Sequence, residues 1–261
     1  PSGSSTPHRL SGLNGMVLTY AHNLSFINIL LLGYLVYFKE LSSKVRLNPV
    51  IVSLMLVINL VCAFLSLTRG AWLSFVFSIP FLFLFRVSFK KWLIICAVTV
   101  SSFYCGLKMT DLDEEFFGTR RMNSNQQRIA FFKTAFESFK EKPLFGLGYK
   151  QFEFNATEIK KRHGLEWSNQ SGHAHNNFFE HLASTGVIGA LSFLFFSLFW
   201  FVESVRLRSA QKYLIQSFCV CVGISGLTQY TFGDAENSVF IMLVWLFTTR
   251  ESLENGGVEL S

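Results

Sequence analysis

The sequence is poor in charged residues. Only 15% of its 261 residues are Asp, Glu, Lys or Arg, whereas 50% are hydrophobic and 30 are Phe. A typical soluble domain carries about 25% charged residues, so this composition argues against a soluble fold and is typical of a polytopic membrane protein. The net charge is +6, but the basic residues lie in short clusters between apolar runs, without the aromatic-interleaved basic surface of a nucleic-acid binder. We expect the lipid bilayer as a partner and no nucleic acid.

Cysteine is also scarce, and its placement excludes two further classes of protein. Four of the five cysteines lie inside apolar runs and the other lies at the end of one, so neither a disulfide framework nor a zinc knuckle is visible. These residues are Cys62, Cys96, Cys105, Cys219 and Cys221. A phosphate loop is missing as well, because Gly146 and Gly148 lack both the Walker spacing and a following Lys-Ser or Lys-Thr.

Apolar runs of membrane-helix length are abundant. Seven runs approach the roughly 20 residues that cross a bilayer as a helix, and the need to satisfy backbone groups in hydrocarbon favours helices throughout. The expected spans are 22–38, 50–67, 70–86, 92–107, 187–202, 213–229 and 237–249. We predict an all-α polytopic membrane protein, with one membrane domain over 1–251 and a disordered cytoplasmic tail over 252–261. Pro1 is followed by neither a basic n-region nor a cleavage site, so we expect no signal peptide and a chain that lacks upstream helices.

The loops between the runs predict the orientation. Short cytoplasmic loops carry excess Lys and Arg, and three of the loops are basic. Their basic residues are Lys39, Lys44 and Arg46, then Arg86, Lys90 and Lys91, then Arg206, Arg208 and Lys212. Strict alternation then places the "LTRGAW" turn, the long loop 108–176 and "TQYTFGDAEN" outside the cytoplasm. The polar clusters with the most chemistry therefore share one face.

The long loop contains a helical pattern. Ile129, Phe132, Phe136 and Phe139 recur at spacings of three and four after a possible cap at Ser124. The pattern predicts an amphipathic helix that lies on the membrane or on the helix bundle.

Two arginines are candidates for anion binding. Arg69 lies between two apolar runs, and Arg128 begins the amphipathic pattern one turn before Phe132. A guanidinium is a fixed cation that is suited to bidentate contact with phosphate. The alternatives are an interfacial anchor for Arg69 and a solvated helix charge for Arg128.

A histidine pair follows the long loop in "SGHAHNNFFEHLASTGVIG". His173 and His175, with His181 nearby, form a possible metal cluster, but no carboxylate or cysteine completes a recognisable zinc spacing. Neighbouring cations favour a neutral imidazole, which is the form that a general base requires. Asn176 follows the pair and is placed to cap the next helix.

Acidic residues give weaker signals. Asp111 and Asp113 form an Asp-x-Asp triplet like that of metal-using glycosyltransferases, but such patterns are common by chance and a run of acids is usually a solvated face. Asp234 lies in the last extracytoplasmic turn, beside the other polar clusters.

The order of the motifs resembles the O-antigen ligase and polymerase superfamily of bacterial envelope glycosyltransferases. The matching stretches are "TRGAWLSF", "QQRIAFFKTAFESFKEKPLFGLGYKQF" and "HAHNNFFEHLASTGVIGALSF", preceded by "RLSGLNGMVLTYAHNLSFINIL". The likeness covers nearly the whole chain, and its central third is the most specific part. Each motif is weak alone, whereas three in order around a large loop form a specific pattern.

The resemblance implies a function. Such proteins are multi-span bacterial inner-membrane enzymes of the broad GT-C kind, which transfer a glycan from undecaprenyl diphosphate to a periplasmic acceptor without a cofactor or, for ligases, a metal. Carried over by motif, Arg69 and Arg128 bind the donor diphosphate, and His175 is the essential histidine. His173 stands where the family often has another polar residue, so the choice between the two imidazoles stays open. The candidate substrate-binding residues are Arg9, His173, Asn176 and Asp234.

The acceptor defines the competing hypotheses. Ligation to lipid A-core is the first, followed by polymerisation of O-antigen or exopolysaccharide on a growing glycan, and then by protein O-glycosylation. A transporter is a different class, but it places ionisable or helix-breaking residues near the bilayer midplane, and the centres of these runs contain almost none. A structural membrane subunit is a further alternative.

Overall fold

The computed structural model describes residues 10, 12, 16–43, 45–84, 86–109, 119–165 and 171–255, and within these ranges every regular element is a helix. The predicted all-α class is confirmed for this part of the chain. The first elements are α1 (Val17–Val36), α2 (Phe38–Leu41), α3 (Pro49–Leu65), α4 (Arg69–Ser78), the 3-10 helix η2 (Ile79–Phe83) and α5 (Phe89–Met109). The others are α7 (Thr119–Glu141), α8 (Gln151–Arg162), α9 (Asn177–Ser204), α10 (Ser209–Thr228) and α11 (Ala235–Asn255).

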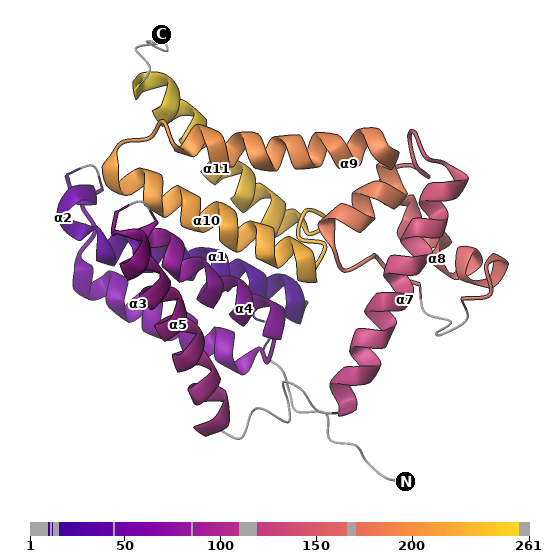
Figure 1. Cartoon of the computed structure of the whole chain (residues 1–261), viewed down its shortest axis with the longest axis horizontal. Helices are drawn as coiled ribbons and strands as arrows, with labels where there is room; N and C mark the ends of the chain where they lie inside the picture. Colours follow the sequence, from indigo (N-terminus) through magenta and orange to yellow (C-terminus); the bar gives the residue numbers. More distant parts are fainter. Residues whose placement is uncertain are drawn as a thin grey trace.

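The helices form a bundle with a smaller helical unit at one end. In the bundle, α1 packs against α3, α4 and α10, and α10 also packs against α4 and α9 (Figure 1). The smaller unit consists of α7 and α8, which pack against each other and against α9. Helix α7 stands across the direction of the bundle helices, at the right of Figure 1. A helix that runs across a bundle end is suited to lie along a membrane surface.

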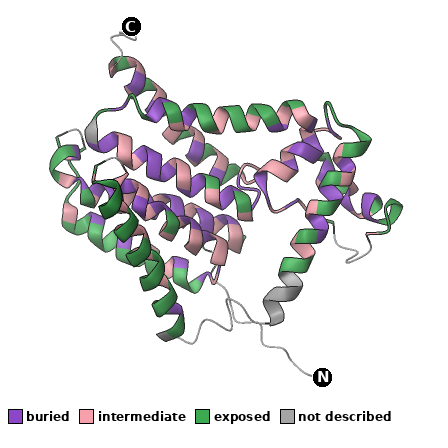
Figure 2. Ribbon diagram, in the orientation of Figure 1, coloured by how far each residue is buried: buried purple, intermediate pink, exposed green. Residues whose placement is uncertain are grey.

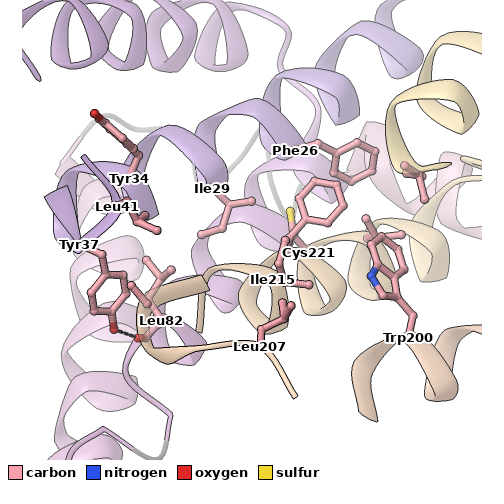
Figure 3. Packing of buried hydrophobic residues seen from close by; sticks show 14 of the residues in the cluster. Phe26, Ile29, Tyr34, Tyr37, Leu41, Leu82, Trp200, Leu207, Ile215 and Cys221 are labelled. Carbon is pink, nitrogen blue, oxygen red and sulfur yellow. Dashed lines mark hydrogen bonds between the residues drawn. The ribbon is translucent and has the colours of Figure 1, made fainter. Parts of the chain in front are cut away.

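Large apolar side chains between α1, η2, α9 and α10 hold the bundle together. Phe26, which is labelled in Figure 3, and Phe218 are fully buried, and their ring centroids lie 5.8 Å apart. Trp200 also packs against Phe218, with the ring centroids 5.8 Å apart. The Tyr37 hydroxyl donates a hydrogen bond to the Leu82 carbonyl, so the polar end of this buried ring is satisfied. This core fixes the ends of α1, α4 and α10 relative to one another.

Three of the described helices, α1, α5 and α9, are long and apolar enough to cross a membrane. The outward faces of α5 and α9 are exposed along much of their length (Figure 2), although their side chains are mostly apolar. Such surfaces suit contact with lipid. Helix α3 and the segment from α4 to η2 are apolar but shorter, and the other predicted spans stay predictions.

Helix α9 breaks at Gly186. The backbone there has φ 67° and ψ −166°, a conformation that is essentially restricted to glycine. Residues Asn177–Thr185 and Val187–Ser204 therefore form two helical pieces, and the second piece spans about 27 Å at the usual rise per residue. That length is close to the roughly 30 Å hydrocarbon core of a bilayer. The break coincides with the start of the span that the sequence predicted at 187–202.

The loop between α7 and α8 fills this break through four backbone hydrogen bonds. The amides of Val187 and Ile188 donate to the carbonyls of Pro143 and Leu144, at 2.8 and 3.4 Å. In return, Leu147 and Gly148 donate to the carbonyls of Ala183 and Ser184, at 3.1 and 2.8 Å. The loop thus replaces bonds that an unbroken helix would make internally. We call the segment 143–148 the clasp.

The sequence prediction for the amphipathic helix needs two corrections. Helix α7 begins at Thr119, so Ser124 lies inside it and does not cap it. The predicted stripe also packs on the protein only in part, because Ile129 and Phe136 are exposed whereas Phe132 stacks on Phe179 of α9. From Asn125 onward, where the structure describes the side chains of α7, the buried residues are Ala130, Phe131, Thr134, Ala135 and Ser138. Small residues on this face let α7 approach α8 and α9 closely, and they carry little of the hydrophobic signal that the pattern used.

The predicted disordered tail needs a correction too. Helix α11 continues to Asn255, four residues into the range 252–261. Ser252 is buried, and the Arg250 Nε donates to Glu254 Oε1 at 2.9 Å, an i to i+4 pair that supports the last turn. Residues 256–261 lie outside the described part of the chain.

Candidate active site

A polar cavity of about 360 Å³ lies between the bundle and the unit of α7 and α8. Its walls come from α1, the start of α4, the middle of α7, the start of α8 and the loop before α9. The lining residues are Leu18, His22, Leu67, Thr68, Arg69, Gly70, Gln127, Arg128, Phe131, Glu153, Ser171, Gly172, His173 and His175. Four sequence-predicted site residues, from three separate motifs, therefore meet in one cavity.

Arg69 enters the cavity from the first residue of α4. Its Nη2 donates a hydrogen bond to Asn125 Oδ1 on α7, at 3.2 Å, so the guanidinium bridges the bundle and α7. The next residue, Gly70, lies against α10, because a Cβ atom at Gly70 would come within 2.4 Å of Thr228 Oγ1. Only glycine allows the two helices to approach this closely. The "TRG" turn therefore brings an arginine to the cavity at a tight helix contact.

Arg128 enters from α7, on the opposite wall. The neighbouring Phe131 is almost fully buried, and its ring lies edge-on to the His175 ring with the centroids 5.9 Å apart. The Lys160 Nζ of α8 lies 3.7 Å from the centre of the same Phe131 ring, a cation–π contact. Burial lowers the pKa of Lys160. Lys160 thus holds the Phe131 ring in place, and this ring forms a wall of the cavity against His175.

One amide side chain connects the two histidines. His175 Nδ1 and Gln229 Oε1 lie 3.0 Å apart, and Gln229 Nε2 lies 3.1 Å from His173 Nε2. An amide oxygen only accepts hydrogen bonds and an amide nitrogen only donates them. His175 Nδ1 therefore carries a proton and donates it to Gln229, while His173 Nε2 accepts. In its neutral form, His175 keeps its lone pair on Nε2, the nitrogen that Gln229 does not use.

The surroundings keep this pair neutral. Burial, the adjacent His173 and the Arg128 guanidinium together lower the pKa of His175 to about 4, and burial has the largest effect. Gln229 acts in the opposite direction and raises it. Burial also lowers the pKa of His173. At neutral pH both imidazoles are uncharged, and His175 is able to accept a proton.

The backbone around the histidines is held in an unusual conformation. His175 has φ 51°, in the left-handed region that non-glycine residues rarely adopt. The Ala174 amide donates to Glu180 Oε2 at 2.8 Å, and Ser184 Oγ donates to Glu180 Oε1 at 3.0 Å. Glu180 is itself buried. This carboxylate therefore ties the loop to the first turns of α9 and stabilises the strained residue.

Asn176 and Asp234 lie beside the cavity and do not line it. Asn176 caps α9, because its Oδ1 accepts from the Phe179 amide at 3.1 Å, and its Nδ2 donates to the Leu227 carbonyl at 3.1 Å. Asp234 Oδ2 accepts from Asn237 Nδ2 at 3.4 Å, and burial raises its pKa. Arg9 and the acidic triplet from Asp111 to Asp113 lie outside the described residues.

His181 does not join the histidine pair. Its ring stacks on Phe193, with the centroids 4.8 Å apart. Across the described ranges, no three His, Cys, Asp or Glu side chains are grouped closely enough to hold a metal ion.

Sequence reasoning missed three polar residues of the site. Gln229 follows α10 and contacts both histidines, which are 54 and 56 positions away in the chain. His22 lines the cavity from α1, with its Nδ1 3.0 Å from Ser225 Oγ of α10. Glu153 contributes a carboxylate from α8. The only sequence signal for Gln229 was its place in "TQYTFGDAEN", the turn predicted on the same face as the other polar clusters.

Comparison with known proteins gives one family. No curated protein sequence matches the chain. The family model described as O-antigen ligase matches residues 54–194, which is more than half of the chain. The matched range contains Arg69, Arg128, His173 and His175, whereas Gln229 lies beyond it. The chain therefore belongs to the O-antigen ligase family and is a glycan-transferring membrane enzyme of the ligase and polymerase kind.

Proposed function

We propose that this protein transfers a glycan from undecaprenyl diphosphate to a hydroxyl group of lipid A-core at the periplasmic face of the bacterial inner membrane. The observation that carries the proposal is the shared cavity, in which Arg69 and Arg128 face a neutral histidine pair. A lipid-linked donor with a diphosphate needs such a combination of cations and a base. The proposal includes a GT-C-like bundle and an extracytoplasmic position for the loop 108–176.

Arg69 and Arg128 bind the diphosphate of the donor in this proposal. Guanidinium groups form bidentate hydrogen bonds with phosphate oxygens and remain charged at all relevant pH values. The two groups come from separate helices, α4 and α7, and Arg69 is already held by Asn125. Such fixed cations stabilise the negative charge that accumulates on the leaving diphosphate, without reorganisation during the reaction.

His175 acts as the general base. The acceptor hydroxyl oxygen attacks the anomeric carbon, and the bond from this carbon to the diphosphate oxygen breaks. The bonding pair leaves with undecaprenyl diphosphate, and the hydroxyl proton moves to His175 Nε2. Nε2 has the lone pair because Nδ1 donates to Gln229. A depressed pKa keeps this nitrogen unprotonated at neutral pH.

A single displacement inverts the configuration of the anomeric carbon. NMR of the newly formed glycosidic bond, compared with that of the donor, tests this step. Retention of configuration would contradict a single in-line displacement, and with it the role assigned to His175.

The acceptor is tested by deletion of the gene. A ligase deletion removes all O-antigen-capped lipopolysaccharide and leaves long polymer on the lipid carrier. Core that carries a single repeat identifies a polymerase instead, which uses the same donor chemistry with a growing glycan as acceptor. An unchanged lipopolysaccharide profile contradicts both. Complementation with the wild-type gene and with the His175→Ala variant separates loss of transfer from loss of the protein, provided that immunoblots find both in the membrane.

A further inference from the structure

The clasp between α7 and α8 is fixed at the membrane-proximal end of the α9 span. Its hydrogen bonds join Pro143 and Leu144 to Val187 and Ile188, the first residues after the break at Gly186. The approach is very close, because a Cβ atom at Gly186 would lie 2.4 Å from the Leu144 carbonyl group. The position of the clasp along α9 is therefore set by close backbone packing and hydrogen bonds.

The clasp exposes large apolar side chains at this level. Leu144 and Phe145 are 59% and 72% exposed, although they belong to a turn that backbone hydrogen bonds hold in place. They lie beside the second piece of α9, which exposes Ile188 and Leu191 in the first turns after the break at Gly186. In Figure 1 this loop lies beside the right-hand end of α9. One apolar surface thus extends from the span onto the clasp.

The residues that flank the clasp are those found at a membrane interface. Lys142 precedes it and Lys150 follows it, and both are exposed. Tyr149 is exposed as well, and the Lys150 Nζ lies 5.9 Å from the centre of its ring. Tyrosine favours the headgroup level of a bilayer, and lysine can extend its ammonium group toward lipid phosphates while its stem covers apolar surface.

We propose that the clasp is a membrane anchor, in which Leu144 and Phe145 insert into the boundary between headgroups and acyl chains, and Lys142 and Lys150 contact anionic lipid headgroups. The proposal depends on α9 crossing the bilayer and not on the transfer reaction. Apolar side chains at this boundary reach about 5–10 Å below the headgroups. The anchor holds α7 and α8, and with them Arg128, at a fixed height above the lipid.

Site-directed spin labelling tests the anchor. The full chain, with its five cysteines replaced by alanine, receives a nitroxide at Phe145→Cys and is reconstituted in nanodiscs that contain phosphatidylglycerol. Glu158→Cys is the matched control, because Glu158 is exposed on α8 and polar. We expect the label at position 145 to collide more with oxygen and less with a nickel chelate than the label at position 158. The accessibilities should place it below the lipid phosphates.

Equal accessibility to the nickel chelate at positions 145 and 158 would overturn the proposal. Leu144→Cys provides a second label on the same turn if the first variant folds poorly, and the same comparison applies to it. Because the readout is depth in the membrane, it does not depend on catalysis. A deep label in an inactive protein would support the anchor and count against the proposed function alone.

Discussion

Two cavities of nearly the same volume border successive residues of α4 and have opposite linings. The first, of about 360 Å³, takes Arg69 and Gly70 together with the histidine pair. The second, of about 370 Å³, begins at Ala71 and Trp72 and lies between α1, α3, α4 and α5, with a lining that is almost entirely apolar. Volume alone therefore does not distinguish the candidate active site from the second cavity, whereas the density of charged and hydrogen-bonding groups does.

The contrast matches an amphiphilic donor. A lipid diphosphate has a charged head, which requires cations and hydrogen-bond donors, and a polyprenyl chain, which requires hydrocarbon. Since both cavities border one short stretch of α4, such a molecule can keep its head at Arg69 while its chain lies along the apolar side. We expect substitutions in the polar cavity to affect the chemical step and those in the apolar cavity to affect donor affinity.

The largest effect is expected from His175→Ala. General-base catalysis contributes about 10²- to 10⁴-fold to the rate, so kcat for glycan transfer should fall by that factor. His173→Ala removes only an acceptor of the Gln229 hydrogen bond and should lower kcat by about tenfold or less. His163→Ala, at an exposed histidine that contacts Glu141 outside the cavity, is the control. A greater loss for His173→Ala than for His175→Ala would reverse the assignment.

A pH profile sharpens the role of Gln229. The active base is the neutral imidazole, so kcat/KM of the wild type should be level near neutral pH and fall only as the pH approaches about 4. In Gln229→Glu, a carboxylate faces His175 Nδ1 and stabilises the imidazolium, which raises the pKa of His175. In this variant, the fall of kcat/KM at acidic pH should therefore begin at a higher pH than in the wild type. A profile that coincides with that of the wild type would show that Gln229 does not act through His175.

The clasp bears on only one of the two cavities. It ties α7 and α8 to α9, and these two helices form walls of the polar cavity but not of the apolar one. Gly186→Ala combines backbone strain with a clash against Leu144, and it should cost about 3–4 kcal/mol. Gly164→Ala also has positive φ, but a Cβ atom there meets no neighbour, so it should cost about 1–2 kcal/mol. Thermal unfolding in detergent measures both. Hydrogen exchange in Gly186→Ala should rise in α7 and α8 before α3 and α5, and uniform exchange would contradict this account.

The smallest effect is expected in the apolar cavity. Gly106 of α5 lines it, and a Cβ atom there would meet no other atom within 4 Å, so Gly106→Leu narrows the cavity without disturbing the helices. KM for a long-chain donor should rise about threefold to tenfold, equivalent to about 1 kcal/mol, while kcat remains near that of the wild type. A short-chain donor is the control. An equal change in KM for both donors would show that the apolar cavity does not bind the lipid chain of the donor.

Hydropathy and motif order predicted the positions of the long helices and four of the charged or titratable residues that share the cavity, but not His22 and Glu153. They did not predict which side of α7 packs on the protein, because in a membrane protein both the protein-facing and the lipid-facing surfaces are apolar. The packed side uses Ala130, Phe131 and Ala135, whereas Ile129 and Phe136 of the predicted stripe are exposed.

The sequence also did not predict the long-range contacts of backbone and side-chain amides. Periodicity does not reveal that Gln229 bonds both His173 and His175, nor that the clasp enters a break in α9. The break at Gly186 is recognised from its backbone conformation, which is essentially restricted to glycine. A glycine in the sequence does not by itself predict such a break.

The most direct test of the account is reconstituted glycan transfer with purified protein in nanodiscs. Undecaprenyl diphosphate-linked O-antigen serves as donor and lipid A-core as acceptor, and the capped product is measured over time. The account predicts product with the wild-type protein and the His163→Ala control, and a loss of at least about 100-fold with each of Arg69→Ala, Arg128→Ala and His175→Ala, while all variants remain folded. Transfer within about twofold of the wild-type rate by any of the three would contradict it.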